Sequence, residues 1–292
     1  MNETIHQEKC NTIPYIGLAS GMGGRLSGSE NGPLVIQAEY PECKWEAMLS
    51  ADAFIENRVE HIALLNQRLA EATFKAAKEN PSVVVIGGDH SCAMGTWSGV
   101  AEARREKGEQ TALLWFDAHM DSHTLETSDS GHPHGMPLAA LLGYGDSRFT
   151  EILSKEQKIK PENLFLIGIR SYEAPEKELL EKLNVRIYYI EEVQQRGLKA
   201  IISEILEVLV ARKIPYGISL DIDFFSPDTM PATGTPENPG AEPEEFIDSC
   251  SLFTEHPPIA FEFVEFNPSL DRDGLSLRYI KKIFDALIPL LP

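Results

Sequence analysis

The sequence predicts a single α/β domain over residues 1–292, with a doubly wound, mainly parallel sheet between two helix layers (a three-layer α/β/α fold). Short apolar runs of strand type alternate with helical stretches from one end of the chain to the other. Several of these runs are apolar at consecutive positions, as in parallel strands that are covered on both faces. No long linker rich in Pro, Gly and Ser divides the chain, and 292 residues suit one large domain.

The expected strands are the short apolar runs, and they come in the order 14–19, 82–86, 111–116, 163–169, 185–190, 216–222 and 259–265. In an open α/β sheet, ligands bind outside the carboxyl ends of the strands. The residues that directly follow each run are therefore the first candidates for a functional site.

Three stretches between the strands place apolar residues at helical spacing. They cover 56–79, 197–212 and 275–290. Their apolar stripes are Val59, Ile62, Leu65 and Leu69; Leu198, Ile201, Ile202, Ile205, Leu206 and Leu209; and Leu277, Ile280, Ile283, Phe284 and Leu287. The polar stretches 120–137 and 226–244 are expected to be ordered, irregular loops, the second being dense in Pro, Gly and Thr.

The composition excludes several classes of partner. Asp and Glu number 45 against 26 Lys and Arg, a formal charge of −19, which repels nucleic acid and anionic membranes and attracts cations. No apolar run approaches the roughly 18 residues of a membrane span, and the N-terminal residues lack the pattern of a signal peptide. Cys10, Cys43, Cys92 and Cys250 have no CxxC spacing, so neither a zinc knuckle nor a disulfide framework is expected. We expect a reduced, cytoplasmic protein.

Three short strings carry side chains of the metal-ligand type. GGDH at 87–90, DAHMD at 117–121 and DID at 221–223 each follow an apolar run. Residues at i, i+2 and i+4 of an extended segment face the same way, and the Gly-Gly turn lets the backbone approach closely. The candidate ligands are His90, Asp117, His119, Asp121, Asp221 and Asp223.

Two imidazoles and four carboxylates suffice to hold two divalent ions with shared oxygens. Oxygen-rich ligation without thiolates favours Mn²⁺ over Zn²⁺. Two such ions, roughly 3.5–4 Å apart, could hold a bridging hydroxide as nucleophile. Four aspartates, two divalent ions and a hydroxide leave a net charge of about −1, which favours a cationic substrate such as a guanidinium and disfavours phosphate esters. Cys92 and Trp115, beside the strings, are more simply explained as buried packing residues.

At these motifs the chain resembles the ureohydrolases, the arginase and agmatinase family, and arginases most of all. The resemblance covers nearly the whole chain through GGDHSCAMG, WFDAHMDSHTLETSDSGHPHGMPLA, LDIDFFSPDTMPATGTP and EFVEFNPSL, in the family's order. It implies an α/β/α fold, a homo-oligomer (trimer or hexamer) and two Mn²⁺ per subunit. It also implies hydrolysis of a small cationic guanidino substrate, most simply L-arginine to L-ornithine and urea.

The resemblance also implies roles for individual residues. His90, Asp117, Asp121 and Asp221 would hold one ion, and His119, Asp117, Asp221 and Asp223 the other. His134, Glu265 and Asp121 are the expected catalytic residues, with His134 as the proton shuttle and Glu265 as the receptor of the guanidinium. The expected substrate-binding residues are His123, Ser130, His132, Glu173, Glu176 and Thr235.

The departures from the family pattern concern the far end of the substrate. His123 and His132 stand where arginases carry Asn, and Glu173 stands where they carry Asp; Ser226 replaces the Asp of the DxDxxDP string. Three alternatives therefore stay open: the same chemistry on agmatine, on another guanidino acid or on formiminoglutamate; a non-catalytic metal-binding member of the fold; and a two-metal phosphoesterase. The absence of an Arg/Lys cluster beside the motifs counts against the last.

Overall fold

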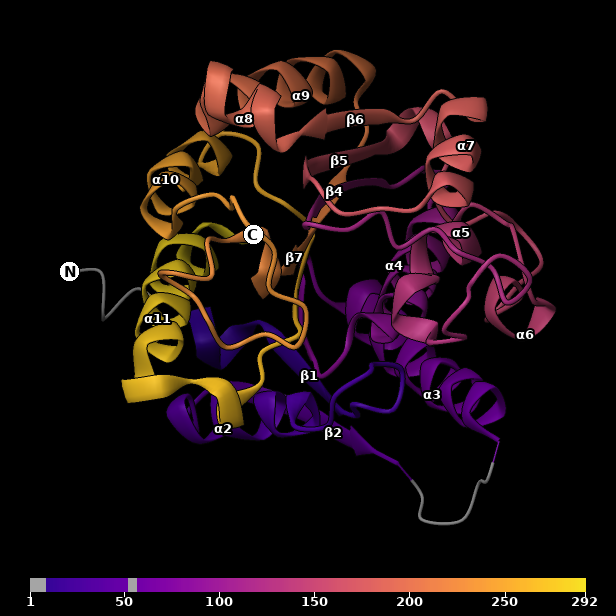
Figure 1. The fold of residues 1–292 in the computed structure, drawn as a ribbon, viewed down its shortest axis with the longest axis horizontal. Coiled ribbons are helices and arrows are strands. Elements are labelled where there is room, and N and C mark those ends of the chain that lie inside the picture. The colour runs from indigo at the N-terminus through magenta and orange to yellow at the C-terminus, as the bar shows by residue number, and fades with distance from the viewer. Residues whose placement is uncertain (1–8, 52–56) are drawn as a thin grey trace.

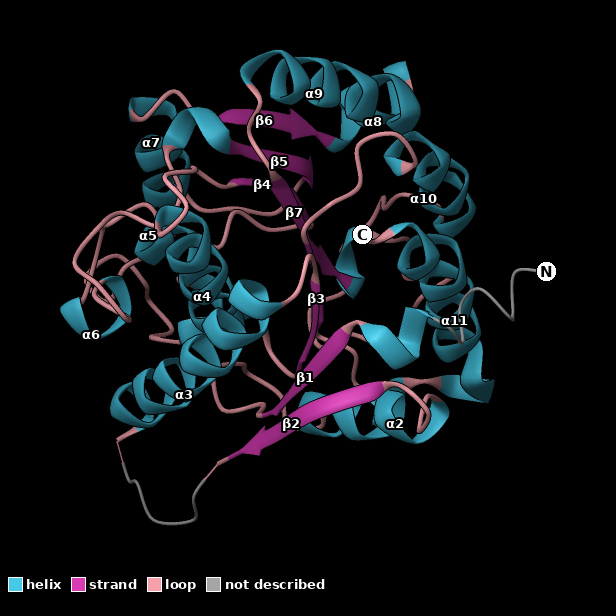
Figure 2. Cartoon of the chain, turned by 180° about the vertical axis from the view of Figure 1, so that it is seen from behind, coloured by secondary structure: helices cyan, strands magenta, loops and turns pink. Residues whose placement is uncertain are grey.

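A computed structural model describes residues 9–51 and 57–292. One parallel sheet forms its centre, with the strand order β2-β1-β3-β8-β7-β4-β5-β6. Figure 2 shows the sheet edge-on between two groups of helices. The strands are β1 (Pro14–Ala19), β2 (Lys44–Ser50), β3 (Val83–Gly87), β4 (Ala112–Phe116), β5 (Leu164–Ile169), β6 (Arg186–Tyr189), β7 (Tyr216–Asp221) and β8 (Ala260–Val264).

The seven predicted strands are all present, and their boundaries agree to within one or two residues. The segment predicted at 185–190 ends as β6 at Tyr189, because Ile190 begins helix α8 (Ile190–Arg196). The strand β2 was not predicted. Within residues 9–51 and 57–292 this edge strand pairs only with β1. It is half-buried and carries Lys44 and Glu46, so it lacks the continuous apolar run of the other strands.

Two layers of helices cover the sheet (Figure 1). One face carries α3 (Arg58–Glu79), α4 (Ala93–Arg105), α5 (Pro137–Leu141), α6 (Ser147–Thr150) and α7 (Ala174–Lys182). The other carries α2 (Gly32–Glu39), α8, α9 (Leu198–Arg212), α10 (Pro243–Ser249) and α11 (Leu275–Leu287). The three predicted helices are α3, α9 and α11; of the range predicted for α3, position 56 lies outside the described residues.

The predicted apolar stripes are largely buried. Leu65 and Leu69 of α3 pack on one face of the sheet, and Ile201 and Ile205 of α9 pack on the other. Ile62 of α3 packs instead against residues of α4, α5 and α6. The α3 helix begins at a capped end, where the Asn57 side chain accepts the N–H of Glu60. No helix in the described ranges is long and apolar enough to cross a membrane.

The expectation about the cysteines was wrong for one pair. Cys10 and Cys43 form a disulfide with a Cα–Cα distance of 4.2 Å, while Cys92 and Cys250 are free and buried. The pair is separated by 33 residues. Spacing along the chain could not reveal it, because the parallel pairing of β1 with β2, which starts at Pro14 and Lys44, brings the two cysteines together.

Candidate metal centre

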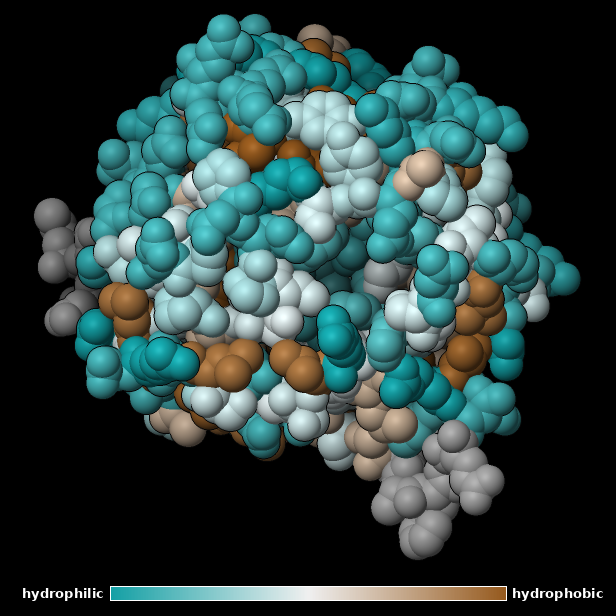
Figure 3. All heavy atoms as spheres, viewed as in Figure 1, coloured by the Kyte–Doolittle hydropathy of each residue, from teal (hydrophilic) through white to brown (hydrophobic). Residues whose placement is uncertain are grey.

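The three metal-ligand strings and Glu265 follow four adjacent strands at the centre of the sheet. These strands are β3, β8, β7 and β4, in that spatial order. All four are parallel, so their carboxyl ends lie at one edge. The edge forms the floor of a pocket of about 190 Å³. Figure 3 shows hydrophilic residues around a depression near the middle of the face seen in Figure 1.

His90 lies within reach of three carboxylates. Its Nδ1 is 3.1 Å from Asp117 Oδ2, 3.2 Å from Asp121 Oδ2 and 3.0 Å from Asp221 Oδ2. This nitrogen is buried and makes no hydrogen bond. The imidazole is held by stacking on Trp115, with ring centroids 4.0 Å apart and planes 3° apart.

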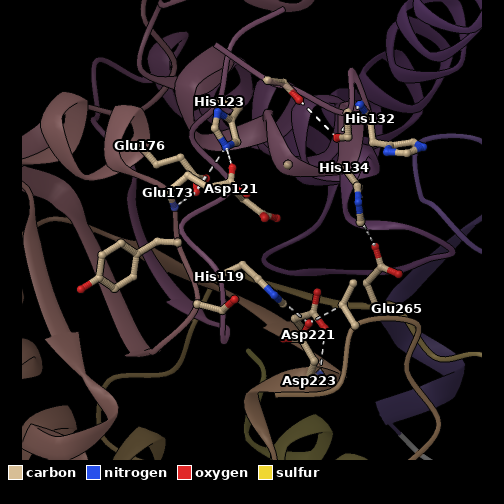
Figure 4. Close-up of a pocket in the computed structure, with 16 residues that line it drawn as sticks. His119, Asp121, His123, His132, His134, Glu173, Glu176, Asp221, Asp223 and Glu265 are labelled. Atoms are coloured by element: carbon tan, nitrogen blue, oxygen red, sulfur yellow. Dashed lines mark hydrogen bonds and ion pairs between the residues drawn. The ribbon is translucent and has the colours of Figure 1, made fainter. Parts of the chain in front are cut away.

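His119 forms a second cluster beside the first. Its Nδ1 is 3.0 Å from Asp223 Oδ2 and 3.5 Å from Asp117 Oδ1. Asp117 therefore faces both histidines, with one carboxylate oxygen towards each. Figure 4 shows His119, Asp221 and Asp223 close together, with Glu265 and His134 next to them.

The physical reason given above for this convergence was wrong. The strands stop too early for the alternation of an extended segment to aim the side chains: β4 ends at Phe116, and Ile222–Phe224 form a 3-10 turn. Instead, Asp117 accepts the N–H of His119 at 2.7 Å and Asp221 accepts the N–H of Asp223 at 2.8 Å. Each of these carboxylates closes a local turn that aims the next ligand.

The electrostatics of the cluster call for cations. Burial and the charge of Asp117 raise the pKa of Asp121 to about 7. Burial, Asp223 and Asp117 raise the pKa of Asp221 well above its ordinary range. Burial opposes charge on His90, but the three surrounding carboxylates raise the pKa of its imidazole well above its usual value. Without metal, the cluster therefore retains protons to reduce the repulsion between its carboxylates.

The donor set fits divalent ions. Two atoms that each bind one ion at about 2.1 Å, with an angle of about 90° between them at the ion, lie about 3.0 Å apart. The distances of 3.0–3.2 Å from His90 Nδ1 to the three carboxylate oxygens are close to this value. Two groups have all their donor atoms within 4.8 Å of one another, His90–Asp117–Asp221 and Asp117–His119–Asp223. The unpartnered lone pair of His90 and the mixture of carboxylates and imidazoles are what a hard or borderline cation requires.

His134 and Glu265 lie together beside these clusters. His134 Nδ1 is 3.2 Å from Glu265 Oε1, and the backbone N–H of His134 donates to Gly23 O. Burial opposes the charged imidazole, but Glu265 outweighs it and raises the pKa of His134 to about 9. Burial would raise the pKa of Glu265, yet His134 holds it below its ordinary value. The two side chains therefore form an ion pair.

The outer pocket is acidic. His123, Glu173 and Glu176 form a third group, in which His123 Nε2 contacts Glu173 Oε2 and lies 3.5 Å from Glu176 Oε2. The other ring nitrogen of His123 is 3.1 Å from Thr127 Oγ1. Both nitrogens of His123 are therefore engaged within the protein. Among the described residues that line the pocket, none is Lys or Arg.

The remaining expected residues also line the pocket. Ser130 Oγ accepts the N–H of His132 and contacts Ser128 Oγ. Burial and nearby positive charges lower the pKa of His132. Thr235 donates its hydroxyl to Asp223 Oδ2 at 2.8 Å, so it supports a carboxylate of the cluster as well as lining the pocket. All six expected substrate-binding residues are found in this one pocket.

Two residues that support the centre, Trp115 and Arg170, were not predicted to do so. Trp115 is buried as expected, but its indole N–H also donates to Asp117 Oδ2 at 2.8 Å. Arg170 donates to the carbonyl oxygens of Gly168, Asp223 and Glu237, which ties the end of β5 to the loop after β7. A charged residue directly after the apolar run 163–169 was the only sequence signal for Arg170.

Comparison with known proteins gives one consistent match. The model of the arginase family matches residues 16–288. The chain is 35% identical to the arginase of Bacillus subtilis (strain 168) over 294 residues, which cover 95% of this chain and 97% of that protein. It is 39% identical to the arginase of Bacillus caldovelox over 211 residues, which cover 72% of this chain and 69% of that protein.

Solved structures agree. A crystal structure of arginase from Bacillus subtilis matches with a TM-score of 0.84 and 31% identity, covering 95% of this chain and 98% of that one. The native structure of the Bacillus caldovelox arginase matches with a TM-score of 0.84, 32% identity and the same coverage. Formimidoylglutamase from Bacillus subtilis matches at 22% identity with a TM-score of 0.77, which shows the shared fold alone.

Proposed function

This chain belongs to the arginase family, and on that premise we propose that it is a manganese-dependent hydrolase that cleaves L-arginine to L-ornithine and urea. One observation carries the proposal. The buried Nδ1 of His90 faces three carboxylates, of which Asp121 and Asp221 line the pocket together with the His134–Glu265 pair. This arrangement can hold cations, receive a guanidinium and deliver a proton in one place.

The proposed ligands divide into two sets that share Asp117 and Asp221. His90, Asp117, Asp121 and Asp221 hold one ion, and His119, Asp117, Asp221 and Asp223 hold the other. The carboxylate-rich sets favour Mn²⁺. When bound, two such ions lower the pKa of a water molecule and stabilise negative charge that develops near them.

Glu265 is the proposed receptor of the substrate guanidinium. Its carboxylate is buried and held by the backbone N–H of His90 at 2.8 Å. A planar guanidinium can donate two parallel hydrogen bonds to a carboxylate, which fixes both its position and its orientation. The acidic lining without Lys or Arg supports the same choice of a cationic substrate.

His134 is the proposed proton donor to the departing amine. In its pair with Glu265 the imidazole is held protonated, because the neighbouring carboxylate raises the pKa of His134. A protonated imidazole at the pocket wall can give up its proton as the bond between the guanidino carbon and the amine nitrogen breaks. Retention of both side chains argues against a non-catalytic member of the fold.

The outer pocket supports a second candidate, hydrolysis of agmatine, which is arginine without its carboxylate. Because both ring nitrogens of His123 are engaged, that residue presents no free donor to a carboxylate. Ser130 and His132 offer only neutral groups for this role. Glu173 and Glu176, by contrast, suit an amino group, which both arginine and agmatine carry. Guanidino acids without an amine and formiminoglutamate fit this lining less well.

The experiment is a hydrolysis assay of the Mn²⁺-loaded protein on L-arginine, agmatine, 4-guanidinobutyrate and formiminoglutamate. We expect urea from L-arginine, with agmatine as the next substrate. Clear turnover of another compound without turnover of arginine rejects the leading proposal. No turnover of any compound by a protein that retains its metal favours the non-catalytic alternative. Family membership also supports a homo-oligomer, a trimer or hexamer, which light scattering tests.

A further inference from the structure

A carboxylate lies at the centre of the sheet, where the proposed chemistry gives it no role. Glu262 is the middle residue of β8, with Phe261 and Phe263 on either side, and its exposed fraction is 0%. An isolated carboxylate at such a place is strongly destabilising unless several donors surround it. Its partners therefore indicate what it does.

Three donors surround Glu262. Its Oε2 accepts the indole N–H of Trp97 at 2.8 Å and the hydroxyl of Ser219, its neighbour on β7, at 2.6 Å. Its Oε1 accepts the thiol of Cys92 at 3.6 Å. Gly217 on β7 leaves room for the Trp97 ring, because a Cβ at this position would lie 2.2 Å from that ring.

These contacts link Glu262 to a proposed metal ligand. Ser219 Oγ is 2.9 Å from His90 Nε2. A carboxylate has no proton to give, so the Ser219 hydroxyl donates to Glu262. The oxygen of Ser219 is then the acceptor for His90, and Nε2 must carry the proton of the imidazole. With Nε2 engaged in this hydrogen bond, Nδ1 is the ring nitrogen left to bind a metal ion.

Nδ1 of His90 faces the proposed metal position. It is the buried atom that lies 3.0–3.2 Å from Asp117, Asp121 and Asp221. The chain Glu262–Ser219–His90 therefore presents a ligand atom, in a fixed orientation, beside the three carboxylates. Trp115 fixes the plane of the same ring by stacking.

Among the residues that the structure describes, His119 has no comparable chain of buried partners. His119 Nε2 lies 3.9 Å from Glu237 Oε1, and the Glu237 side chain is 41% exposed. His119 itself is 24% exposed, against 1% for His90. The supporting contacts are therefore buried and hydrogen-bonded on one side of the centre, and solvent-exposed on the other.

We propose that Glu262, acting through Ser219, is a positioning residue that fixes the orientation of His90 and so strengthens one metal position selectively. The inference rests on the proposed metal centre. Outer partners of this kind change metal affinity by about 10- to 100-fold. The effect is confined to the ion held by His90, because His119 does not contact this chain of hydrogen bonds.

The test compares Mn²⁺ binding by the metal-depleted full-length protein and its variants, using calorimetry and the Mn²⁺ content after gel filtration. Ser219→Ala should weaken one of two ions by about 10- to 100-fold and leave the other unchanged. Ser219→Thr keeps the hydroxyl and should retain affinity. Glu262→Gln keeps the shape and loses the charge, and it should weaken the same ion. Anomalous scattering from Mn²⁺-soaked crystals should locate the depleted position beside His90.

Trp97→Phe is the matched control. It removes the other hydrogen bond to Glu262 Oε2 without touching Ser219 or His90, so it should lower the melting temperature of the metal-free protein but leave both affinities intact. Unchanged affinities in Ser219→Ala and Glu262→Gln, or an equal loss in Trp97→Phe, would overturn the inference alone. A wild-type protein that takes up no Mn²⁺ would reject the proposed function and this inference together.

Discussion

Glu265 Oε1 accepts two hydrogen bonds, from the Nδ1–H of His134 at 3.2 Å and from the backbone N–H of His90 at 2.8 Å. The residue proposed to receive the guanidinium is therefore already paired with the residue proposed to donate the proton. A guanidinium that approaches Glu265 arrives next to a protonated imidazole. Substrate binding and proton delivery thus depend on the same carboxylate, whose backbone adopts a left-handed conformation with φ 63°.

Replacement of the proposed proton donor should affect turnover and leave metal binding intact. We expect His134→Asn to lower kcat by about 10²- to 10⁴-fold, the usual contribution of a general acid. The variant should still hold two Mn²⁺ per chain, because the His134 side chain pairs with Glu265 and is not one of the six proposed ligands. Turnover and metal content are measured on the same sample. An unchanged kcat would show that the proton comes from elsewhere.

The same pair predicts a pH dependence of stability in the metal-free protein. Folding raises the pKa of His134 from 6.5 to about 9. A raised pKa stabilises the fold fully below pH 6.5, and this contribution disappears as the pH rises through 9. The melting temperature of the wild type should therefore exceed that of His134→Asn most at pH 6 and least at pH 10. A difference that stays constant across this range would contradict the assignment.

Removal of metal should destabilise the protein at neutral pH. Without cations, the buried carboxylates repel one another, as the raised pKa values of Asp121 and Asp221 indicate. At a Mn²⁺ concentration of 100 times Kd, each bound ion adds about 2.7 kcal/mol to the free energy of unfolding. For a chain of 292 residues this corresponds to a rise in melting temperature of roughly 4 °C per ion, or about 9 °C for two ions. Asp223→Asn should show a smaller rise; the absence of any rise in the wild type would count against a metal centre.

His123 should control the choice between substrates. In the present structure its ring nitrogens contact Glu173 and Thr127. We expect His123→Asn to release Glu173 and to supply an amide donor, raising the ratio of kcat/KM for L-arginine over agmatine by about 3- to 10-fold, the worth of one neutral hydrogen bond. Glu178→Gln, at an exposed position on α7 outside the pocket lining, is the control and should leave the ratio unchanged. A ratio that does not change in His123→Asn would remove His123 from the account of specificity.

Seven of the strands and the helices α3, α9 and α11 were predictable from the sequence, because apolar runs and helical stripes indicate which faces are buried. The helix α4 was not predicted, although most of its residues are buried. The strand β2 could not be predicted, because this edge strand carries Lys44 and Glu46 and has no continuous apolar run. The three metal strings were recognisable because each follows a strand. The orientation of their side chains could not be predicted, because it depends on local turns that Asp117 and Asp221 close.

Pairings between distant segments were the least accessible. The Cys10–Cys43 disulfide depends on the pairing of β1 with β2. The contact of Glu262 with Ser219 depends on the registry of β7 with β8. A single Glu within the apolar run AFEFV was a signal that a buried polar partner exists, but nothing in the sequence names that partner.

The most direct test of the metal centre is a crystal structure of the Mn²⁺-loaded protein with anomalous diffraction measured at the manganese edge. We expect two peaks, one bound by His90 Nδ1 with Asp117, Asp121 and Asp221, the other by His119 Nδ1 with Asp117, Asp221 and Asp223. Density for no ion, or for ions bound by other side chains, would contradict the account.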